Sequence, residues 1–399
     1  MHQCKHPIRL GTLCGVCGKD MSDTSDSLYC PLYTTDAILA TKEEASKIIN
    51  QEVDDNKLIL ILDLDQTLIH ASMNPHIEDL ISKHSSSSID PLQSEIDSIH
   101  SFVIDNINYY IKLRPHLSDF LKKLQPFYQF FVYTMGNRIY ANKVISIIDP
   151  TGEYFGDRIV TRDENLGMLS KSIERIVPNY TERVVILDDR ADVWKFSKSL
   201  VLIKPYYFFV EGDINNPDLM HKNTKHEIID KQILDPPINK KKLIYANFYD
   251  TELAILMNYF ETLHTKYFNT NNKSVKHILK ETKKAVFKGL KFYISDFNRG
   301  YINRKYIKGL IILHGGKIKR RINKQISFII SEKENPEIIE KGRKYKRNII
   351  HYKWVLESVF AMRQVEPMNF LISETIYDDY TDFIDDLENE FFNDPLNGP

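Results

Sequence analysis

The sequence predicts an α/β fold in two parts: a mainly parallel sheet covered on both faces, followed by a smaller α/β domain. Short apolar strands alternate with helix-like stretches from residue 57 to about 202. A second strand–helix alternation occupies roughly 285–372, and 399 residues are enough for two or three cores. Such alternation is typical of parallel sheets, because the crossover helices cover both faces.

The strands of the first part are short and apolar. They are KLILILD (57–63), QFFVYT (129–134), RIVTR (158–162), RVVILDD (183–189) and LVLI (200–203). The helix-like stretches are HLSDFLKKL (116–124), NRIYANKVISII (137–148) and ELAILMNYFETLHTKYF (252–268).

Three segments depart from this alternation. Residues 74–100 contain a serine run at 85–88 and are predicted to be a loose insertion. SFVIDNINYYIKL (101–113) is predicted to form a β-hairpin with DNIN at its turn. Residues 205–247 are rich in Pro, Asn and Lys, which predicts a second irregular insertion.

The composition is that of a globular protein, with 42% hydrophobic and 27% charged residues. No apolar run reaches the roughly 18 residues of a membrane span, and MHQCKHPIRL has no apolar signal-peptide core. Four cysteines do not make a disulfide scaffold in a chain of this size, so a reducing compartment is expected.

Charge is divided unevenly along the chain. Residues 271–353 hold 23 Lys/Arg against six Asp/Glu, whereas 374–394 hold nine Asp/Glu and no Lys or Arg. This pattern is typical of a polyanion-facing segment beside an acidic interaction tail, although a well-solvated lysine-rich surface explains it equally. No nucleic acid recognition motif stands out, so direct nucleic-acid binding is not expected.

Reactive side chains gather at the carboxyl ends of the strands, where ligands bind in open α/β sheets. They are Asp63, Asp65, Thr134, Asp188 and Asp189, with Lys171 predicted to start a helix between the last two of these strands. Clustered carboxylates need a cation among them, and oxygen ligands favour Mg²⁺. One carboxylate can attack phosphorus while a second protonates the leaving oxygen. The set therefore predicts Mg²⁺-dependent phosphoryl transfer.

Each of these residues also has a purely structural explanation. An aspartate after a strand can cap the next helix, and an Asp–Arg pair at 189–190 can be a surface ion pair. Thr134 can belong to a turn, and Lys171 can be an ordinary exposed lysine. The occurrence of the whole set in order, at the ends of successive strands, favours the catalytic interpretation.

The motifs resemble the haloacid-dehalogenase superfamily and, within it, RNA polymerase II C-terminal-domain phosphatases of the large, TFIIF-associating type. The matching blocks are LDLDQTLIHA, YIKLRPHLSDFL, YTMGNRIYANKVISIIDP, FGDRIVTRDE, KSIERIVP, VVILDDRADVW, YYFFVEGDINNP and LHTKYF. The resemblance implies a haloacid-dehalogenase-like (Rossmann-like) domain with insertions. It also implies a nuclear protein serine/threonine phosphatase that acts on the polymerase's heptapeptide repeats.

The resemblance further implies roles at the metal. Asp63 would be the nucleophile and a Mg²⁺ ligand, and Asp65 the general acid and base, with its backbone carbonyl facing the metal. Asp188 and Asp189 would place Mg²⁺ directly or through water, and Thr67 would fix the turn.

Four other positions would serve the substrate. Thr134 and Lys171 would hold the phosphoryl oxygens. Arg114 and Asp163 occupy positions that the family uses near the active site. Arg114 would pair either with phosphate or with an acidic neighbour.

The block at 285–372 resembles a BRCT domain. HGG (314–316) suits the tight turn after the first helix. Trp354 suits the aromatic residue that anchors the last helix. Ser295 ends the first strand, where some BRCT domains bind phosphate, but a structural serine is the alternative.

The two ends of the chain suggest further sites. CKHPIRLGTLCGVCGKD resembles a block of the same phosphatases, in which Cys14 and Cys17 can bind Zn²⁺ together with Cys4 and His6 or Cys30. Unligated thiols are the alternative. The acidic segment 377–392 resembles the tail with which the large phosphatases bind TFIIF, and a disordered solubilising tail is the alternative.

The predicted organisation has five parts. They are an N-terminal segment (1–50), a phosphatase domain with insertions (51–268), a linker (269–284), a BRCT domain (285–372) and an acidic tail (373–399). Two other functions compete: a superfamily phosphatase with another phosphoprotein or small-molecule substrate, and a catalytically silent scaffold. The BRCT-like block argues against a metabolite enzyme, and the intact set of reactive residues argues against a scaffold.

Overall fold

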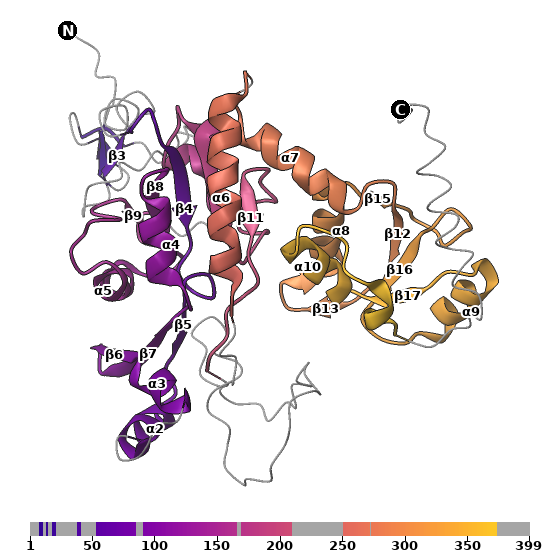
Figure 1. The fold of residues 1–399 in the computed structure, drawn as a ribbon, viewed down its shortest axis with the longest axis horizontal. Helices are drawn as coiled ribbons and strands as arrows, with labels where there is room; N and C mark the ends of the chain where they lie inside the picture. The colour runs from indigo at the N-terminus through magenta and orange to yellow at the C-terminus, as the bar shows by residue number, and fades with distance from the viewer. Residues whose placement is uncertain are drawn as a thin grey trace. The chain divides into compact units, whose positions relative to one another are not determined.

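The computed structural model describes residues 8–10, 13–14, 18–20, 38–40, 53–84, 91–165, 169–209, 250–271 and 273–372 (Figure 1). The chain divides into two compact units, Met1–Glu281 and Thr282–Pro399. No helix of the described residues is long and apolar enough to cross a membrane. Near the N-terminus, short antiparallel strands form a sheet of order β2-β1-β3: β1 (Ile8–Leu10), β2 (Leu13–Cys14) and β3 (Ile38–Ala40).

A five-stranded parallel sheet forms the centre of the first unit and confirms the predicted fold class. Its order is β11-β10-β4-β8-β9, and every neighbouring pair is parallel. The strands are β4 (Leu58–Leu62), β8 (Tyr128–Tyr133), β9 (Ile159–Val160), β10 (Val184–Asp188) and β11 (Leu200–Leu202). All five residues of β4 are fully buried, so both faces of the sheet are covered.

Helices pack on this sheet through a shared apolar core. They are α4 (Leu117–Leu124), α5 (Arg138–Ile148) and α6 (Glu252–Asn269), as the spacing predicts. Figure 1 shows α4 and α6 side by side, and the rings of Phe120 and Phe260 meet between them at 6.0 Å. The chain runs from β4 to β8 and β9 on one side, then returns to β10 on the other side of β4. This reversal creates a topological switch point beside β4, the usual place of an α/β active site.

The predicted hairpin is confirmed. Strand β6 (Ile99–Ile104) pairs antiparallel with β7 (Ile107–Leu113), which also pairs with β5 (Ile69–Ser72). At the turn, Asp105 and Asn106 both have positive φ, the conformation that tight hairpin turns require and that Asn and Asp tolerate.

The first insertion differs from the prediction of a loose segment. It contains α2 (His76–His84) and α3 (Pro91–Asp97), and the serine run lies outside the described residues. Ile77 of α2 and Ile96 of α3 are buried against Tyr110 and Phe208. Tertiary packing of a few isoleucines therefore orders a sequence whose local composition suggests a loop. Of the second insertion, residues 210–249 lie outside the described range.

The segment 269–284, expected to be a linker, is largely helical. Helix α7 (Val275–Val286) occupies most of it and continues beyond residue 284. Val275 and Leu279 are fully buried in the core of the first unit. The amphipathic face of α7 explains why this polar sequence is ordered, since apolar residues recur at helical spacing among the lysines.

The second unit is a small parallel sheet of order β15-β12-β16-β17 with helices. Its elements are β12 (Lys291–Ile294), β13 (Asn298–Arg299), β14 (Ile302–Asn303), α8 (Arg304–Leu313), β15 (Lys317–Ile318), β16 (Phe328–Ser331), α9 (Pro336–Tyr345), β17 (Ile349–His351) and α10 (Lys353–Phe360). Trp354 of α10 is fully buried, and its ring contacts Phe287, Phe292 and Phe328. This contact fits the anchoring role expected from the sequence.

Gly315 makes the tight turn after α8. Its φ is +93°, and a Cβ at this position would lie 2.2 Å from the carbonyl oxygen of Lys284. We expect Gly315→Ala to lower the free energy of unfolding by about 3 kcal/mol, because both the backbone conformation and the close approach exclude a side chain. Gly300→Ala is the matched control, since Gly300 has φ +63° but no atom within 4 Å of the added Cβ. Urea unfolding that gives equal losses for the two variants would contradict this explanation.

Candidate active site

The ends of three adjacent strands bring the predicted acidic residues together. Asp63 follows β4, and Asp188 ends β10, which pairs with β4 up to Leu187. Thr134 follows β8 on the other side of β4, and Asp189 follows Asp188. All four side chains are buried. The structure thus places them at one edge of the sheet, as its parallel topology dictates.

Lys171 lies between two of these carboxylates. Its Nζ donates to Asp63 Oδ1 at 2.6 Å and to Asp188 Oδ2 at 2.7 Å. Burial disfavours the ammonium, but the charges of Asp188 and Asp63 raise the pKa of Lys171 above its usual value. The prediction that Lys171 starts a helix is wrong. Lys171 lies in an irregular segment before η1 (Ile173–Arg175), which is one turn of 3₁₀ helix, and its backbone N–H donates to the carbonyl oxygen of Val193.

One lysine does not neutralise the cluster. Burial raises the pKa of Asp63 to about 7, an effect that Lys171 opposes and Asp188 reinforces. Burial and the neighbouring charges of Asp188 and Asp63 also raise the pKa of Asp189 well above its usual value. The site therefore carries more buried negative charge than its own cation can offset.

The carboxylates have the chemistry of a site for a hard cation. One oxygen from each of Asp63, Asp188 and Asp189 lies within 4.8 Å of the other two. Asp189 Oδ2 is buried and accepts no hydrogen bond, which is costly for a carboxylate oxygen unless a ligand binds there. A cluster of carboxylate oxygens with an orphaned member fits Mg²⁺.

Asp65 lies beside this cluster but has a different environment. The Tyr140 hydroxyl donates to Asp65 Oδ1 at 2.5 Å. Burial, together with the charge of Asp65, raises the pKa of Tyr140 well above 10, so the phenol stays protonated and remains a donor. Two neighbouring carboxylates with different partners are the usual basis for separate catalytic roles.

The two threonines shape the loops at the strand ends. Thr67 Oγ1 accepts from the backbone N–H of Asp189 at 3.1 Å, which joins the turn after β4 to the end of β10. Thr134 Oγ1 accepts from the N–H of Gly136 at 3.0 Å. Both side chains are fully buried, and both stand where the sequence placed them.

Arg114 does not fit a role in binding substrate. Its side chain is fully buried, with Nε and one terminal nitrogen donating to the carboxylate of Asp250 at 2.9 and 2.8 Å. It also donates to the backbone carbonyls of Thr67 and Lys204. The acidic neighbour is therefore its partner, and Arg114 braces the turn after β4 that follows Asp63 and Asp65.

The role predicted for Asp163 in binding substrate stays a prediction. The exposed carboxylate of Asp163 accepts from the backbone N–H of Arg138, at the start of α5. An acidic group at this place stabilises the first turn of the helix. Its observed contact is structural. Ser295 likewise has a structural contact, because its buried hydroxyl donates to Ser331 Oγ.

The pair between Arg114 and Asp250 gives a test of stability. We expect Asp250→Ala to lower the free energy of unfolding by about 3–5 kcal/mol, because it leaves a buried guanidinium without its carboxylate. Asp55→Ala is the control, since Asp55 is 90% exposed in its pair with Arg183 and should cost less than about 1 kcal/mol. Thermal melts that show similar losses in both variants would contradict the assignment.

Sequence reasoning missed three residues of the site. Trp194 Nε1 donates to Asp188 Oδ2 at 2.8 Å, Tyr140 contacts Asp65, and Asp250 pairs with Arg114. The first two lie inside blocks that carry the family resemblance, and a tryptophan six residues after Asp188 was the available signal. No sequence signal indicated Asp250, because it lies 136 residues beyond its partner Arg114.

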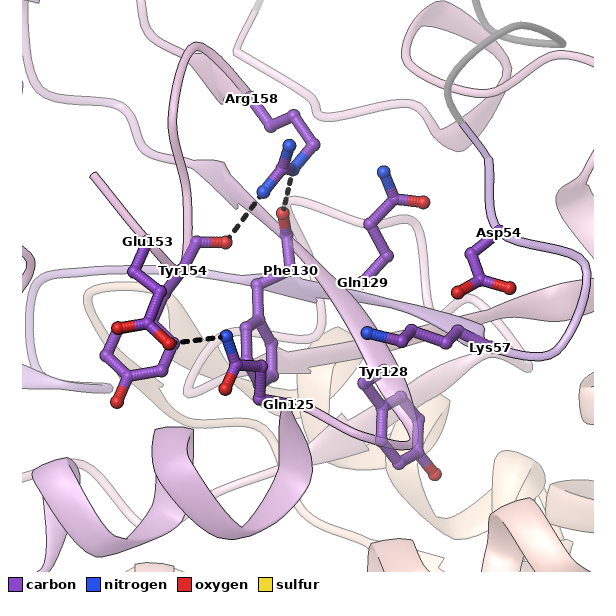
Figure 2. A pocket seen from close by; sticks show the side chains of 9 residues that line it. All are labelled: Asp54, Lys57, Gln125, Tyr128, Gln129, Phe130, Glu153, Tyr154 and Arg158. Carbon is purple, nitrogen blue, oxygen red and sulfur yellow. Dashed lines mark hydrogen bonds between the residues drawn. The ribbon is translucent and has the colours of Figure 1, made fainter. Parts of the chain in front are cut away.

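A cavity of about 170 Å³ lies at the opposite end of the sheet, around the residue before β4 and the start of β8 (Figure 2). Its lining mixes Lys57 and Arg158 with Asp54 and Glu153. Figure 2 shows that Arg158 is already bonded to backbone carbonyls, among them that of Phe130 at 3.0 Å. The mixed charge and the absence of clustered ligands in this lining make it a poor candidate for the chemistry.

The predicted zinc ligands cannot be placed. Cys4, His6, Cys17 and Cys30 lie outside the described residues, as does the side chain of Cys14, whose backbone ends β2. The zinc site stays a prediction. The acidic tail from 373 onward also lies outside the described residues.

Comparison with known proteins identifies the family. The model of NLI interacting factor-like phosphatases matches residues 58–230, and that of the BRCT domain matches 285–371. An RNA polymerase II C-terminal domain phosphatase of Encephalitozoon cuniculi is 32% identical over 420 residues, covering 94% of this chain and 96% of that protein. The chain belongs to the RNA polymerase II C-terminal-domain phosphatase family.

Two further relatives agree with this assignment. The enzyme of the same name from Schizosaccharomyces pombe is 37% identical over 232 residues, which are 53% of this chain and 32% of that protein. The structure of Fcp1, an essential RNA polymerase II CTD phosphatase, superposes with a TM-score of 0.66 at 26% identity and covers 83% of this chain and 99% of the other. These similarities confirm the predicted fold class and show that the chain is a protein phosphatase.

Proposed function

We propose that this chain is a Mg²⁺-dependent serine/threonine phosphatase acting on the phosphorylated heptapeptide repeats of the largest RNA polymerase II subunit. The buried cluster of Asp63, Asp188 and Asp189 around Lys171 carries the chemical part of this proposal. The substrate follows from the relatives, one of which matches nearly the whole chain. A nuclear location follows from the same substrate.

In this proposal two aspartates carry out the chemical steps. Asp63 attacks phosphorus, so that a bond forms between its carboxylate oxygen and phosphorus while the bond to the serine oxygen breaks. Asp65, held by Tyr140, gives its proton to the departing serine oxygen. Water then attacks phosphorus of the aspartyl-phosphate, and Asp65 takes the proton of that water. Inorganic phosphate leaves, the Asp63 carboxylate is regenerated, and Asp65 again carries its proton.

The other residues position the phosphoryl group. Lys171, from the irregular segment before η1, and the Thr134 hydroxyl, at the end of β8, would hold its oxygens. Asp63, Asp188 and Asp189, with the backbone carbonyl of Asp65, would hold Mg²⁺, which supplies positive charge between the phosphoryl group and the carboxylates. The ammonium of Lys171 already pairs with two carboxylates, so its single positive charge cannot by itself offset the charge of an incoming phosphoryl dianion.

A partner follows from the sequence of the tail. The acidic residues of 377–392, spaced among aromatic and aliphatic ones, suit an amphipathic helix that binds a basic groove. We include TFIIF as the partner of this tail, by similarity to the large phosphatases.

Phosphate release from heptapeptides phosphorylated on serine, measured with and without Mg²⁺, tests the proposal. We expect Mg²⁺-dependent release from the peptides, with a generic aryl phosphate as the comparison substrate. Hydrolysis of the aryl phosphate without the peptides would keep the chemistry and overturn the substrate. Folded protein that hydrolyses neither in the presence of Mg²⁺ would overturn both.

A further inference from the structure

Trp194 contacts both charges that meet at the end of β10. Its indole N–H donates to Asp188 Oδ2 at 2.8 Å, and its ring lies 5.6 Å from the ammonium of Lys171. The side chain is 4% exposed, so these contacts are made away from bulk water. We propose that Trp194 is a positioning residue that fixes Asp188 and Lys171 for metal binding, an inference that rests on the proposed function.

Three hydrogen bonds fix the orientation of the Asp188 carboxylate. Oδ2 accepts from both Lys171 and Trp194, while Oδ1 accepts from the backbone N–H of Arg190 at 2.8 Å. Asp189, by contrast, has an oxygen that accepts no hydrogen bond. Trp194 thus holds one ligand of the cluster in a fixed orientation, and the neighbouring ligand keeps an open oxygen for the cation. A group that donates a hydrogen bond to a metal ligand orients that ligand and tunes the affinity of the site for the metal.

Aromatic rings also contact the ammonium of Lys171. Its ammonium lies 5.7 Å from the ring of Tyr133, which packs edge-on against Trp194 at a centroid distance of 5.5 Å. The backbone N–H of Lys171 donates to the carbonyl of Val193 at 2.8 Å, so the residue next to Trp194 also anchors the lysine. Two aromatic faces and one backbone bond direct the ammonium toward the carboxylates of Asp63 and Asp188.

The contribution of the indole N–H can be isolated by Trp194→Phe, which keeps an aromatic ring beside Lys171 and removes the donor to Asp188. We expect the Kd of the full-length chain for Mg²⁺, measured by calorimetry without substrate, to rise about 10- to 100-fold. The KM for phosphopeptide at saturating Mg²⁺ should stay unchanged. Trp354→Phe is the matched control, because it changes the chain's other tryptophan, in the second unit, and should leave the Kd unchanged.

Three outcomes of the calorimetry are distinguishable. Weaker Mg²⁺ binding in folded Trp194→Phe alone supports the positioning role. Equal Kd values in wild type and Trp194→Phe overturn it and leave the proposed function intact. A wild-type chain that binds no Mg²⁺ overturns the proposed metal requirement and the positioning role together.

A second measurement does not depend on the folding of Trp194→Phe. In Trp354→Phe the only remaining tryptophan is Trp194, so its fluorescence reports directly on the site. We expect Mg²⁺ to shift the emission of Trp194, with the same midpoint as in calorimetry, because the cation changes the field at the carboxylate that the indole contacts. Metal binding without any change in emission would contradict the contact on which the inference depends.

Discussion

Asp63→Asn is expected to abolish phosphate release, with a loss of at least about 10⁴-fold in kcat. The amide has nearly the shape of the carboxylate but lacks the charged oxygen that attacks phosphorus. It should not unfold the protein, because burial already disfavours the ionised form of Asp63, whose pKa is raised to about 7. Release from phosphoserine heptapeptides with Mg²⁺, beside a thermal melt, measures both effects.

Asp55→Asn is the matched control for this prediction. It makes the same chemical change on an exposed aspartate whose partner is Arg183, far along the sheet from the cluster. Its kcat should equal that of the wild type within about twofold, as for a surface substitution. An Asp63→Asn variant that is folded and stays within about tenfold of wild-type activity would rule out Asp63 as the nucleophile.

The strand ends of the site could be predicted because parallel strands have one carboxyl edge. A sequence that ends a buried strand at Asp63 and another at Asp188 must bring both to that edge, whatever the order of the strands. The five strands and the hairpin follow from period and from turn residues, which are local properties. Local signals were therefore sufficient to predict that these carboxylates cluster.

The remaining parts of the site depend on contacts between distant segments. Lys171 reaches the cluster from an irregular segment whose position is set by Val193 and the Trp194 ring, and no periodicity indicates this. Arg114 could pair with substrate or with an acidic residue on sequence grounds alone. Its actual partner, Asp250, became evident only from the structure, since α4, α5 and the strands from β8 to β11 lie between the two in the sequence.

The insertion at 74–100 shows why composition can mislead about order. Its helix α2 starts after Asn74, whose side chain accepts from the N–H of His76, an ordinary helix-start signal that the serine run outweighed in the prediction. Ile77 and Ile96 then bury fully against Tyr110. The apolar residues that order this insertion are few, so their effect is visible only when their common partner is known.

Mg²⁺ affinity is expected to rise steeply with pH and to level off near pH 7. Asp63 has its pKa raised from 3.8 to about 7 in the folded chain, and the pKa of Asp189 is also raised. A raised carboxyl pKa means that the folded state holds its proton more tightly. The metal-free chain therefore loses stability as pH rises from about 4 to about 7. Mg²⁺ binds the ionised carboxylates, so binding below pH 7 must release those protons.

The expected slope is about one log unit of affinity per pH unit if Asp63 alone releases a proton, and about two if Asp189 does so as well. Calorimetry in buffers of different ionisation enthalpy gives this proton count directly. In thermal melts, Mg²⁺ at about 100 times its Kd at pH 8 should add roughly 2.7 kcal/mol of stability, which is several degrees in Tm. The same concentration should add almost nothing at pH 5.

The difference between melts with and without Mg²⁺ is the informative quantity, because stability changes that do not involve the cation are common to both. The buried Glu164 adds little to either melt over this range: burial opposes the shift, but hydrogen bonds from Thr161 and the nearby Arg138 lower its pKa, so it titrates at lower pH. In Asp63→Asn the pH dependence of Mg²⁺ affinity should flatten by about one log unit per pH unit, because one titrating ligand is gone. An affinity in the wild type that stays constant from pH 5 to 8 would show that the cation does not bind at these carboxylates.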